Sequence, residues 1–397
     1  MDVAVAIEQL SEAIRKDPGP VEPWLRLVRV LIIAGKSNQA ISALEQRHAV
    51  GADSLSVLYD ALGLMVLQNE PSVRSFLAAV PQLHVFQPVV TNLKAFVAVM
   101  DEQADTAVML LRNALAMLPH IKSFAETDGA FVQRVYPILV NQVEQLATRD
   151  EVMRYDADEP PVGIEIDGGV RANTKLVVAT AADSRYIEKF AESYVDSFTE
   201  FADDAIVLNI HAIDPDAAAE ECLARIVDRN PNVIISRERD RVFGRRKVYF
   251  ACSRFLITSE LIEQTNLPIL FTDIDVSFRR PIFSIVDCLP QADLALFETG
   301  HCAPQLRCDA AAVYFAPTEG AKTFLRILRR YLAEKLRENA NWMLDQAALW
   351  SITRTFVDSE RVRYLDLTRV LAMAQGEFIE KYRDDGAKQR LRNSQDV

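Results

Sequence analysis

The sequence predicts a chain of two parts, an all-α helical domain followed by a three-layer α/β domain. Two observations predict this division. In the first 150 residues, apolar side chains recur every three or four positions, which is the spacing of amphipathic helices. From Lys175 onward, short apolar runs alternate with segments of helical length. Because such alternation favours a parallel sheet between two layers of helices, we expect a largely parallel sheet in the second part.

The composition is that of a globular protein with a substantial core. The chain has 397 residues, of which 50% are hydrophobic and 25% charged, and this length suggests two or three domains. The net charge of −12 argues against a general nucleic-acid binder. No apolar run reaches the length of a transmembrane segment, which is about 18 residues, and the N-terminus lacks the basic segment of a signal peptide. The five cysteines have no metal-binding spacing, so we expect free thiols and a cytoplasmic location.

Residues 1–150 are expected to form a short helical array. Helical apolar stripes over 4–14 and 24–32 are separated by the breaker Asp17–Pro20. The order of large and small residues resembles the tetratricopeptide repeat, in Trp24, Leu27, Gly35, Ala40 and Leu44. We expect about three helix pairs, with a degenerate middle pair at Leu58, Leu62 and Leu67. Such an array presents a concave face to a peptide or partner protein; the alternative is a structural cap or dimer surface.

A linker over 151–174 separates the two predicted domains, because it contains two prolines and three glycines among many acidic residues. The α/β domain then occupies 175–397. Its first strand, Lys175–Thr180, is followed by a helix over 186–198. A second strand, helix and strand follow over 205–210, 217–229 and 232–236. The glycine-rich motifs of dinucleotide-binding and Walker-type proteins do not occur.

A pair of aspartates follows a buried strand in the middle of this domain. The apolar run Leu267–Phe271 leads directly into Asp273 and Asp275. Side chains at i and i+2 of an extended chain point the same way, and open α/β sheets bind ligands at the carboxyl ends of their strands. Buried carboxylates are normally paired or bound to metal, and a dication that also touches phosphate would neutralise both. The alternative is that both are turn residues that close the strand.

The sequence Thr272–Val276 (TDIDV) after an apolar strand resembles the DxD motif of GT-A-fold glycosyltransferases, which use nucleotide-diphosphate sugars. The resemblance covers Lys175–Tyr382. It implies a GT-A-like, Rossmann-like three-layer catalytic domain, which follows the tetratricopeptide-like domain in the chain. It also implies that Asp273 and Asp275 bind Mn²⁺ or Mg²⁺ against the diphosphate of a UDP- or GDP-sugar.

Two further segments fit the family's order of motifs. Asp309–Thr318 fits the frame N-[AG]-G-x-x-x-F-x-P-T, but it has Asp309 in place of asparagine and lacks the glycine. Asp345 and Gln346 resemble the Asp-Gln pair of several retaining families, in which the carboxylate faces the sugar and the acceptor. The alternative for Asp345 is a helix N-cap. Related enzymes often take a third metal ligand, frequently histidine, from the C-terminal region, but this chain has no histidine after His301.

The resemblance extends to a full set of candidate site residues. The catalytic candidates are Asp345, Gln346 and, less directly, Glu298. The nucleotide-sugar contacts expected are Thr180, Ala181, Asp183, Tyr186, Lys247, Arg254, Asp273 and Ala311. Lys247 and Arg254 belong to a basic stretch that forms either an anion site or a solvated helix face.

The function that these patterns favour is metal-dependent transfer of a hexosyl or related sugar, with retention of configuration. The helical repeats suggest an acceptor that is a protein or peptide. The alternative is a non-catalytic scaffold or adaptor with a degenerate transferase domain, which the missing glycine and histidine favour.

Overall fold

The computed structural model describes residues 3–34, 36, 39–40, 42–43, 46–47, 74, 77, 87–116, 143–156, 165–167, 170–239, 242, 244–289, 291–299, 303–338, 340–369 and 379–381. The chain divides into two compact units. One comprises Met1–Thr148 with His301–Ala303, and the other comprises Arg149–Gly300 with Pro304–Val397.

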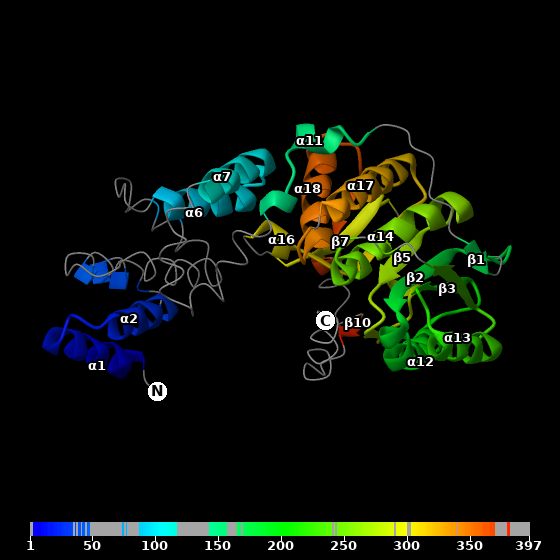
Figure 1. The fold of residues 1–397 in the computed structure, drawn as a ribbon, viewed down its shortest axis with the longest axis horizontal. Helices are drawn as coiled ribbons and strands as arrows, with labels where there is room; N and C mark the ends of the chain where they lie inside the picture. The colour runs from blue at the N-terminus through cyan, green and yellow to red at the C-terminus, as the bar shows by residue number, and fades with distance from the viewer. Residues whose placement is uncertain are drawn as a thin grey trace. The chain divides into compact units, whose positions relative to one another are not determined.

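The described elements of the first unit are all helical (Figure 1). Helix α1 (Val3–Lys16) packs on α2 (Val21–Ile33), and α6 (Gln87–Met100) packs on α7 (Ala104–Ala116), followed by the short η2 (Val143–Gln145). The indole nitrogen of Trp24 donates a hydrogen bond to the carbonyl of Pro18 at 3.0 Å and so closes the turn between α1 and α2. The tetratricopeptide assignment stays a prediction. The expected middle repeat, with Leu58, Leu62 and Leu67, lies outside the described residues.

The second unit is built on a mixed eight-stranded sheet in the order β1-β4-β3-β2-β5-β8-β7-β9. Its strands are β1 (Glu165–Asp167), β2 (Leu176–Asp183), β3 (Ile206–Ile213), β4 (Val233–Glu238), β5 (Ile269–Thr272), β7 (Leu294–Glu298), β8 (Cys308–Phe315) and β9 (Tyr364–Asp366). A second, two-stranded sheet pairs β6 (Val276–Phe278) with β10 (Ile379–Lys381).

The expectation of a largely parallel sheet is correct for four of its seven strand pairs, which include β7 with β9. Strands β4, β3, β2 and β5 run parallel, as the alternating pattern predicts. Strand β8 runs antiparallel to both β5 and β7, and β1 runs antiparallel to β4. The connection from β7 to β8 contains only the short helix α16 (Pro304–Arg307). Such a short connection cannot make the crossover that parallel neighbours need, so β7 and β8 pair antiparallel.

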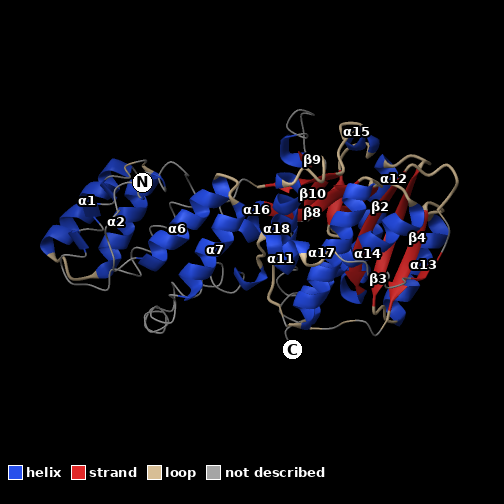
Figure 2. Cartoon of the chain, turned by 90° about the horizontal axis from the view of Figure 1, so that it is seen from above, coloured by secondary structure: helices blue, strands red, loops and turns tan. Residues whose placement is uncertain are grey.

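Helices cover both faces of this sheet (Figures 1 and 2). One layer contains α12 (Ser184–Phe201) and α13 (Ala217–Arg229); the other contains α14 (Arg246–Thr265), α17 (Glu319–Arg337) and α18 (Leu344–Asp358). Side-chain alternation along β5 separates the layers. Leu270 belongs to the core under α12, whereas Phe271 packs against Phe255 of α14, with 6.3 Å between the centroids of the two rings. The short helices α11 (Arg149–Met153) and α15 (Phe283–Val286) complete the unit.

Side-chain caps explain where α12 and α17 begin. The carboxylate of Asp183 accepts a hydrogen bond from the amide of Tyr186 at 3.0 Å, which makes Asp183 the N-cap of α12. Thr318 caps α17 through the amide of Ala321 in the same way. Strand β2 therefore passes directly into α12 without a loop, and small residues stand at the junction. None of the helices within the described ranges is long and apolar enough to cross a membrane.

Candidate active site

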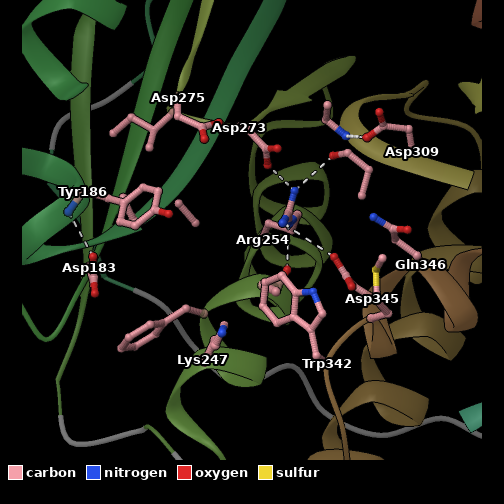
Figure 3. Close-up of a pocket in the computed structure, with 18 residues that line it drawn as sticks. Asp183, Tyr186, Lys247, Arg254, Asp273, Asp275, Asp309, Trp342, Asp345 and Gln346 are labelled. Atoms are coloured by element: carbon pink, nitrogen blue, oxygen red, sulfur yellow. Dashed lines mark hydrogen bonds and ion pairs between the residues drawn. The ribbon is translucent and has the colours of Figure 1, made fainter. Parts of the chain in front are cut away.

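A pocket opens at the carboxyl ends of β2 and β5, where the parallel half of the sheet meets α14 and the start of α18 (Figure 3). Open α/β sheets bind their ligands at this edge. The candidate residues that line it are Ala181, Asp183, Tyr186, Lys247, Arg254, Asp273, Asp275, Ala311, Asp345 and Gln346. Folding thus brings residues that are up to half the chain apart to one place.

Two of the candidate residues do not line this pocket. Thr180 is fully buried on β2 and has the same parity as Val178 and Ala182, which belong to the core under α12. Its side chain therefore points to the other face of the sheet from Ala181. Glu298 lies at the end of β7 in a buried polar network. It accepts hydrogen bonds from the guanidinium of Arg354 and, at 2.9 Å, from the hydroxyl of Tyr364.

Asp273 and Asp275 both face the pocket, as the strand-end position predicts (Figure 3). Strand β5 ends at Thr272, and the amide of Asp273 continues the β5–β8 pairing by donating to the carbonyl of Ala311 at 3.0 Å. Ile274 and Asp275 do form a turn after β5, but the side chains of Asp273 and Asp275 also line the pocket.

Arg254 joins the two acidic motifs. Its guanidinium forms an ion pair with the carboxylate of Asp273, and its other terminal nitrogen lies 3.5 Å from a carboxylate oxygen of Asp345. It also donates to the carbonyls of Ala310 at 3.0 Å and Ala251 at 2.6 Å. Burial opposes the charge of Arg254, but Asp273 and Asp345 outweigh it, so the pKa of Arg254 is raised. The guanidinium is thus fixed as a bridge between carboxylates, and a contact with phosphate stays a prediction.

Asp345 lies in the first turn of α18 and is only 4% exposed. The N-cap of this helix is Met343, which has a positive φ of 72° and makes no side-chain capping bond. The alternative of Asp345 as the N-cap is therefore wrong. Burial raises the pKa of Asp345, the charge of Arg254 opposes that rise, and the neighbouring Asp309 adds to it.

Gln346, the residue after Asp345, ties the first turn of α18 to neighbouring elements. With its amide nitrogen placed according to the hydrogen-bond network, it donates to the carbonyl of Gln305 at 2.7 Å and to that of Cys308 at 3.3 Å. Those carbonyls belong to α16 and β8. In this arrangement Gln346 ties α18 to the sheet beside the pocket and so helps to hold its neighbour Asp345 in place.

The pocket is strongly acidic. In the part of the chain that the structure describes, its lining contains the carboxylates of Asp183, Asp273, Asp275, Asp309 and Asp345 and two cationic side chains, Lys247 and Arg254. An anionic diphosphate would therefore be repelled unless further positive charge entered with it. Among the described residues, no three His, Cys, Asp or Glu side chains are placed together as metal ligands. Two carboxylates nevertheless suit Mg²⁺ or Mn²⁺, since such ions commonly take one or two carboxylates and complete their shell with phosphate oxygens and water.

No protein-family model matches the sequence, and no curated protein matches it either. Solved structures are similar in part. The apo structure of the bifunctional WbbM is 11% identical, with a TM-score of 0.37, over 55% of this chain and 47% of that one. GlyE of Streptococcus pneumoniae TIGR4 is 16% identical, with a TM-score of 0.37, over 53% and 55%. LgtC with donor and acceptor sugar analogues is 12% identical, with a TM-score of 0.30, over 44% and 69%. Each of the three is a glycosyltransferase. The chain thus spans about half the length of WbbM and about half the length of GlyE.

Two aromatic residues of the pocket were not among the candidates. Phe250 lies on the face of α14 that also presents Lys247 and Arg254, so helical spacing from these two would have found it. Trp342 lies three residues before Asp345. It precedes α18 in an irregular segment, and hydrophobic periodicity gives no signal for such a position.

Replacing Asp345 with asparagine tests the consequence of its raised pKa. A carboxyl whose pKa is higher in the folded protein stabilises the fold most below its ordinary pKa of 3.8, and that contribution is lost as pH rises through the raised pKa. Asp345→Asn removes the penalty, so we expect unchanged or increased resistance to urea at pH 7 and a smaller fall in stability from pH 4 to pH 7. A variant that loses stability at pH 7 would mean that the ion pair with Arg254 outweighs burial.

Proposed function

We propose that this protein is a metal-dependent glycosyltransferase that moves a hexosyl or related residue from a UDP- or GDP-sugar to an acceptor. The observation that supports it most is the meeting, in one acidic pocket at the carboxyl edge of the sheet, of the strand-end pair Asp273 and Asp275 with Asp345. Two aspartates at positions i and i+2 are common in proteins. In this pocket, however, Arg254 bridges Asp273 to Asp345, which lies on a helix more than 70 residues further along the chain. A turn that only closes a strand does not explain this bridge.

Each residue of the pocket has a part in this proposal. Asp273 and Asp275 hold Mn²⁺ or Mg²⁺, which supplies Lewis-acid stabilisation of the departing diphosphate when bound. Lys247 on α14 supplies a further positive charge, which stabilises the negative charge of the departing diphosphate. Ala181, Asp183 and Tyr186 contact the nucleotide at the end of β2, where small residues allow close approach to the backbone.

The remaining residues position the reacting groups. Arg254 keeps Asp273 and Asp345 at a fixed separation through its two terminal nitrogens. Asp345 accepts a hydrogen bond from a hydroxyl of the sugar or acceptor, and Gln346 keeps α18 in register with β8. Ala311 lines the floor beside Asp309. Retention of configuration, suggested by the Asp345-Gln346 pair, belongs to the same proposal, as does an acceptor on a protein or peptide recruited by the helical domain.

The proposal is tested by release of nucleoside diphosphate from a panel of UDP- and GDP-sugars, with and without Mn²⁺. We expect slow hydrolysis of at least one donor without acceptor, dependent on the metal and abolished by EDTA. Product anomers measured by NMR would test retention. Absence of both binding and turnover across the panel would instead favour the scaffold or adaptor alternative.

A further inference from the structure

Trp342 differs from the other tryptophans of the chain. The sequence contains three. Trp24 and Trp350 are 3% and 1% exposed and belong to cores, whereas Trp342 is 39% exposed and lines the pocket. An indole left partly open to water at the wall of a pocket offers a flat apolar face to a ligand.

The indole is held in a defined place. The ammonium of Lys247 lies 5.2 Å from the centroid of the Trp342 ring, within the range of a cation–π interaction. The guanidinium of Arg245 donates to the side-chain oxygen of Asn341 at 2.6 Å, which ties the segment before α18 to the start of α14. The cation–π contact and the hydrogen bond to Asn341 position Trp342 before any ligand arrives, which lowers the entropic cost of binding.

Helix α14 connects the indole with the carboxylate cluster. Lys247, under the indole, and Arg254, between Asp273 and Asp345, are seven residues apart on the same face of α14. Trp342 and Asp345 line the same pocket and are three residues apart in the sequence.

In the proposed function, the nucleotide lies in another part of the pocket. A second aromatic, Tyr186, lines the pocket next to Asp183, at the end of β2 where the nucleotide is proposed to lie. In Figure 3, Tyr186 lies with Asp183 to the left of Arg254 and Trp342 lies below Arg254, and Asp345 lines the same pocket. A group resting on Trp342 would thus approach the carboxylates of Asp345 and Asp309, which accept hydrogen bonds from hydroxyls.

We infer that Trp342 is a stacking platform for a sugar ring of the acceptor, and hence that the acceptor of this enzyme carries a saccharide. The inference rests on the proposed function. The apolar C–H face of a pyranose lies on the indole, and its hydroxyls reach Asp345 and Asp309. A glycan attached to a protein would satisfy both this inference and recruitment by the helical domain.

Tryptophan fluorescence tests the inference on the full chain. The protein is saturated with UDP or GDP and Mn²⁺, and quenching by acrylamide is measured with and without galactose, N-acetylglucosamine, lactose or maltose. Because the other two tryptophans are buried, accessible quenching reports mainly on Trp342. We expect at least one saccharide to reduce it severalfold, and Trp342→Phe to remove the effect on fluorescence.

Variants separate a platform for the acceptor from other roles. Trp342→Ala should weaken saccharide binding, measured by calorimetry, about tenfold, which corresponds to about 1.4 kcal/mol, while the Kd for the nucleotide changes less than twofold. Trp342→Phe, which keeps a ring, should restore most of the affinity. Leu365→Ala, at another exposed apolar residue outside the pocket, is the matched control.

Two results would overturn the inference. Protection of Trp342 by uridine or guanosine alone, with a weaker Kd for the nucleotide in Trp342→Ala, would make it a base platform. Failure of every saccharide to protect the indole, in a protein that binds a nucleotide sugar, would exclude a sugar platform while leaving the proposed function standing. Failure of the proposed function is distinct, because no nucleotide sugar would then bind.

Discussion

Replacing Asp275 with asparagine lowers kcat/KM for sugar transfer by about 10²–10³-fold, the scale of losing one electrostatic stabiliser of a transition state. The variant removes one of the two pocket carboxylates proposed to hold the metal but keeps the size and shape of the side chain. The activity lost should not be recovered by raising the donor concentration. It should be partly recovered by raising Mn²⁺, because weakened metal affinity is the cause.

Two controls accompany Asp275→Asn. Asp287→Asn changes an exposed aspartate of the same unit outside the pocket, and it should retain full activity. Thermal unfolding of Asp275→Asn should be unchanged, which separates loss of chemistry from loss of fold. A fully active Asp275→Asn enzyme would remove the metal role of this residue.

Replacing Arg254 with glutamine should destabilise the fold by about 3–5 kcal/mol, the range measured when one partner of a buried ion pair is removed. The guanidinium is largely buried between Asp273 and Asp345, and glutamine would leave these two carboxylates without compensation. Urea unfolding at pH 7 measures the loss. Activity should fall as well, because Asp273 and Asp345 would no longer be held at a fixed separation.

The stability of this variant should depend on pH because carboxylates are negatively charged only above their pKa. Without Arg254, the pKa of the buried Asp345 carboxyl should lie further above its ordinary value in the folded protein, so its destabilising effect is absent at acid pH and grows as pH rises. The difference in free energy of unfolding between the wild type and the variant should therefore become smaller towards pH 4. Arg246→Gln, on the same helix but with a side chain 65% exposed, should cost less than about 0.5 kcal/mol. A gap that is independent of pH would indicate lost packing instead of uncompensated charge.

The sequence was informative where local rules apply. Strand and helix periodicity placed the parallel half of the sheet, and α13 lies over the residues expected, Ala217–Arg229. The carboxyl-edge rule places Asp273 and Asp275 in a pocket because it depends only on strand direction, although Ile274 and Asp275 form a turn and do not extend the strand as the i, i+2 argument assumes.

Other features depend on tertiary contacts that no local pattern encodes. The antiparallel insertion of β8 between β5 and β7 is a pairing choice between distant segments. The predicted strand ends at Thr180, and the resemblance implies a nucleotide contact there, but β2 continues to Asp183 and places Thr180 on the opposite face of the sheet from Ala181. The bridging role of Arg254 needs two partners that lie 19 and 91 residues further along the chain.

The central claim is that Asp273 and Asp275 bind a divalent cation together with a nucleotide-diphosphate sugar. Calorimetric titration of the full chain with UDP- and GDP-sugars, in the presence and absence of Mn²⁺, tests it most directly. The proposal predicts saturable binding of at least one sugar nucleotide only when Mn²⁺ is present, and its loss in Asp275→Asn. Binding that is equally tight without the metal and in the variant would contradict the claim.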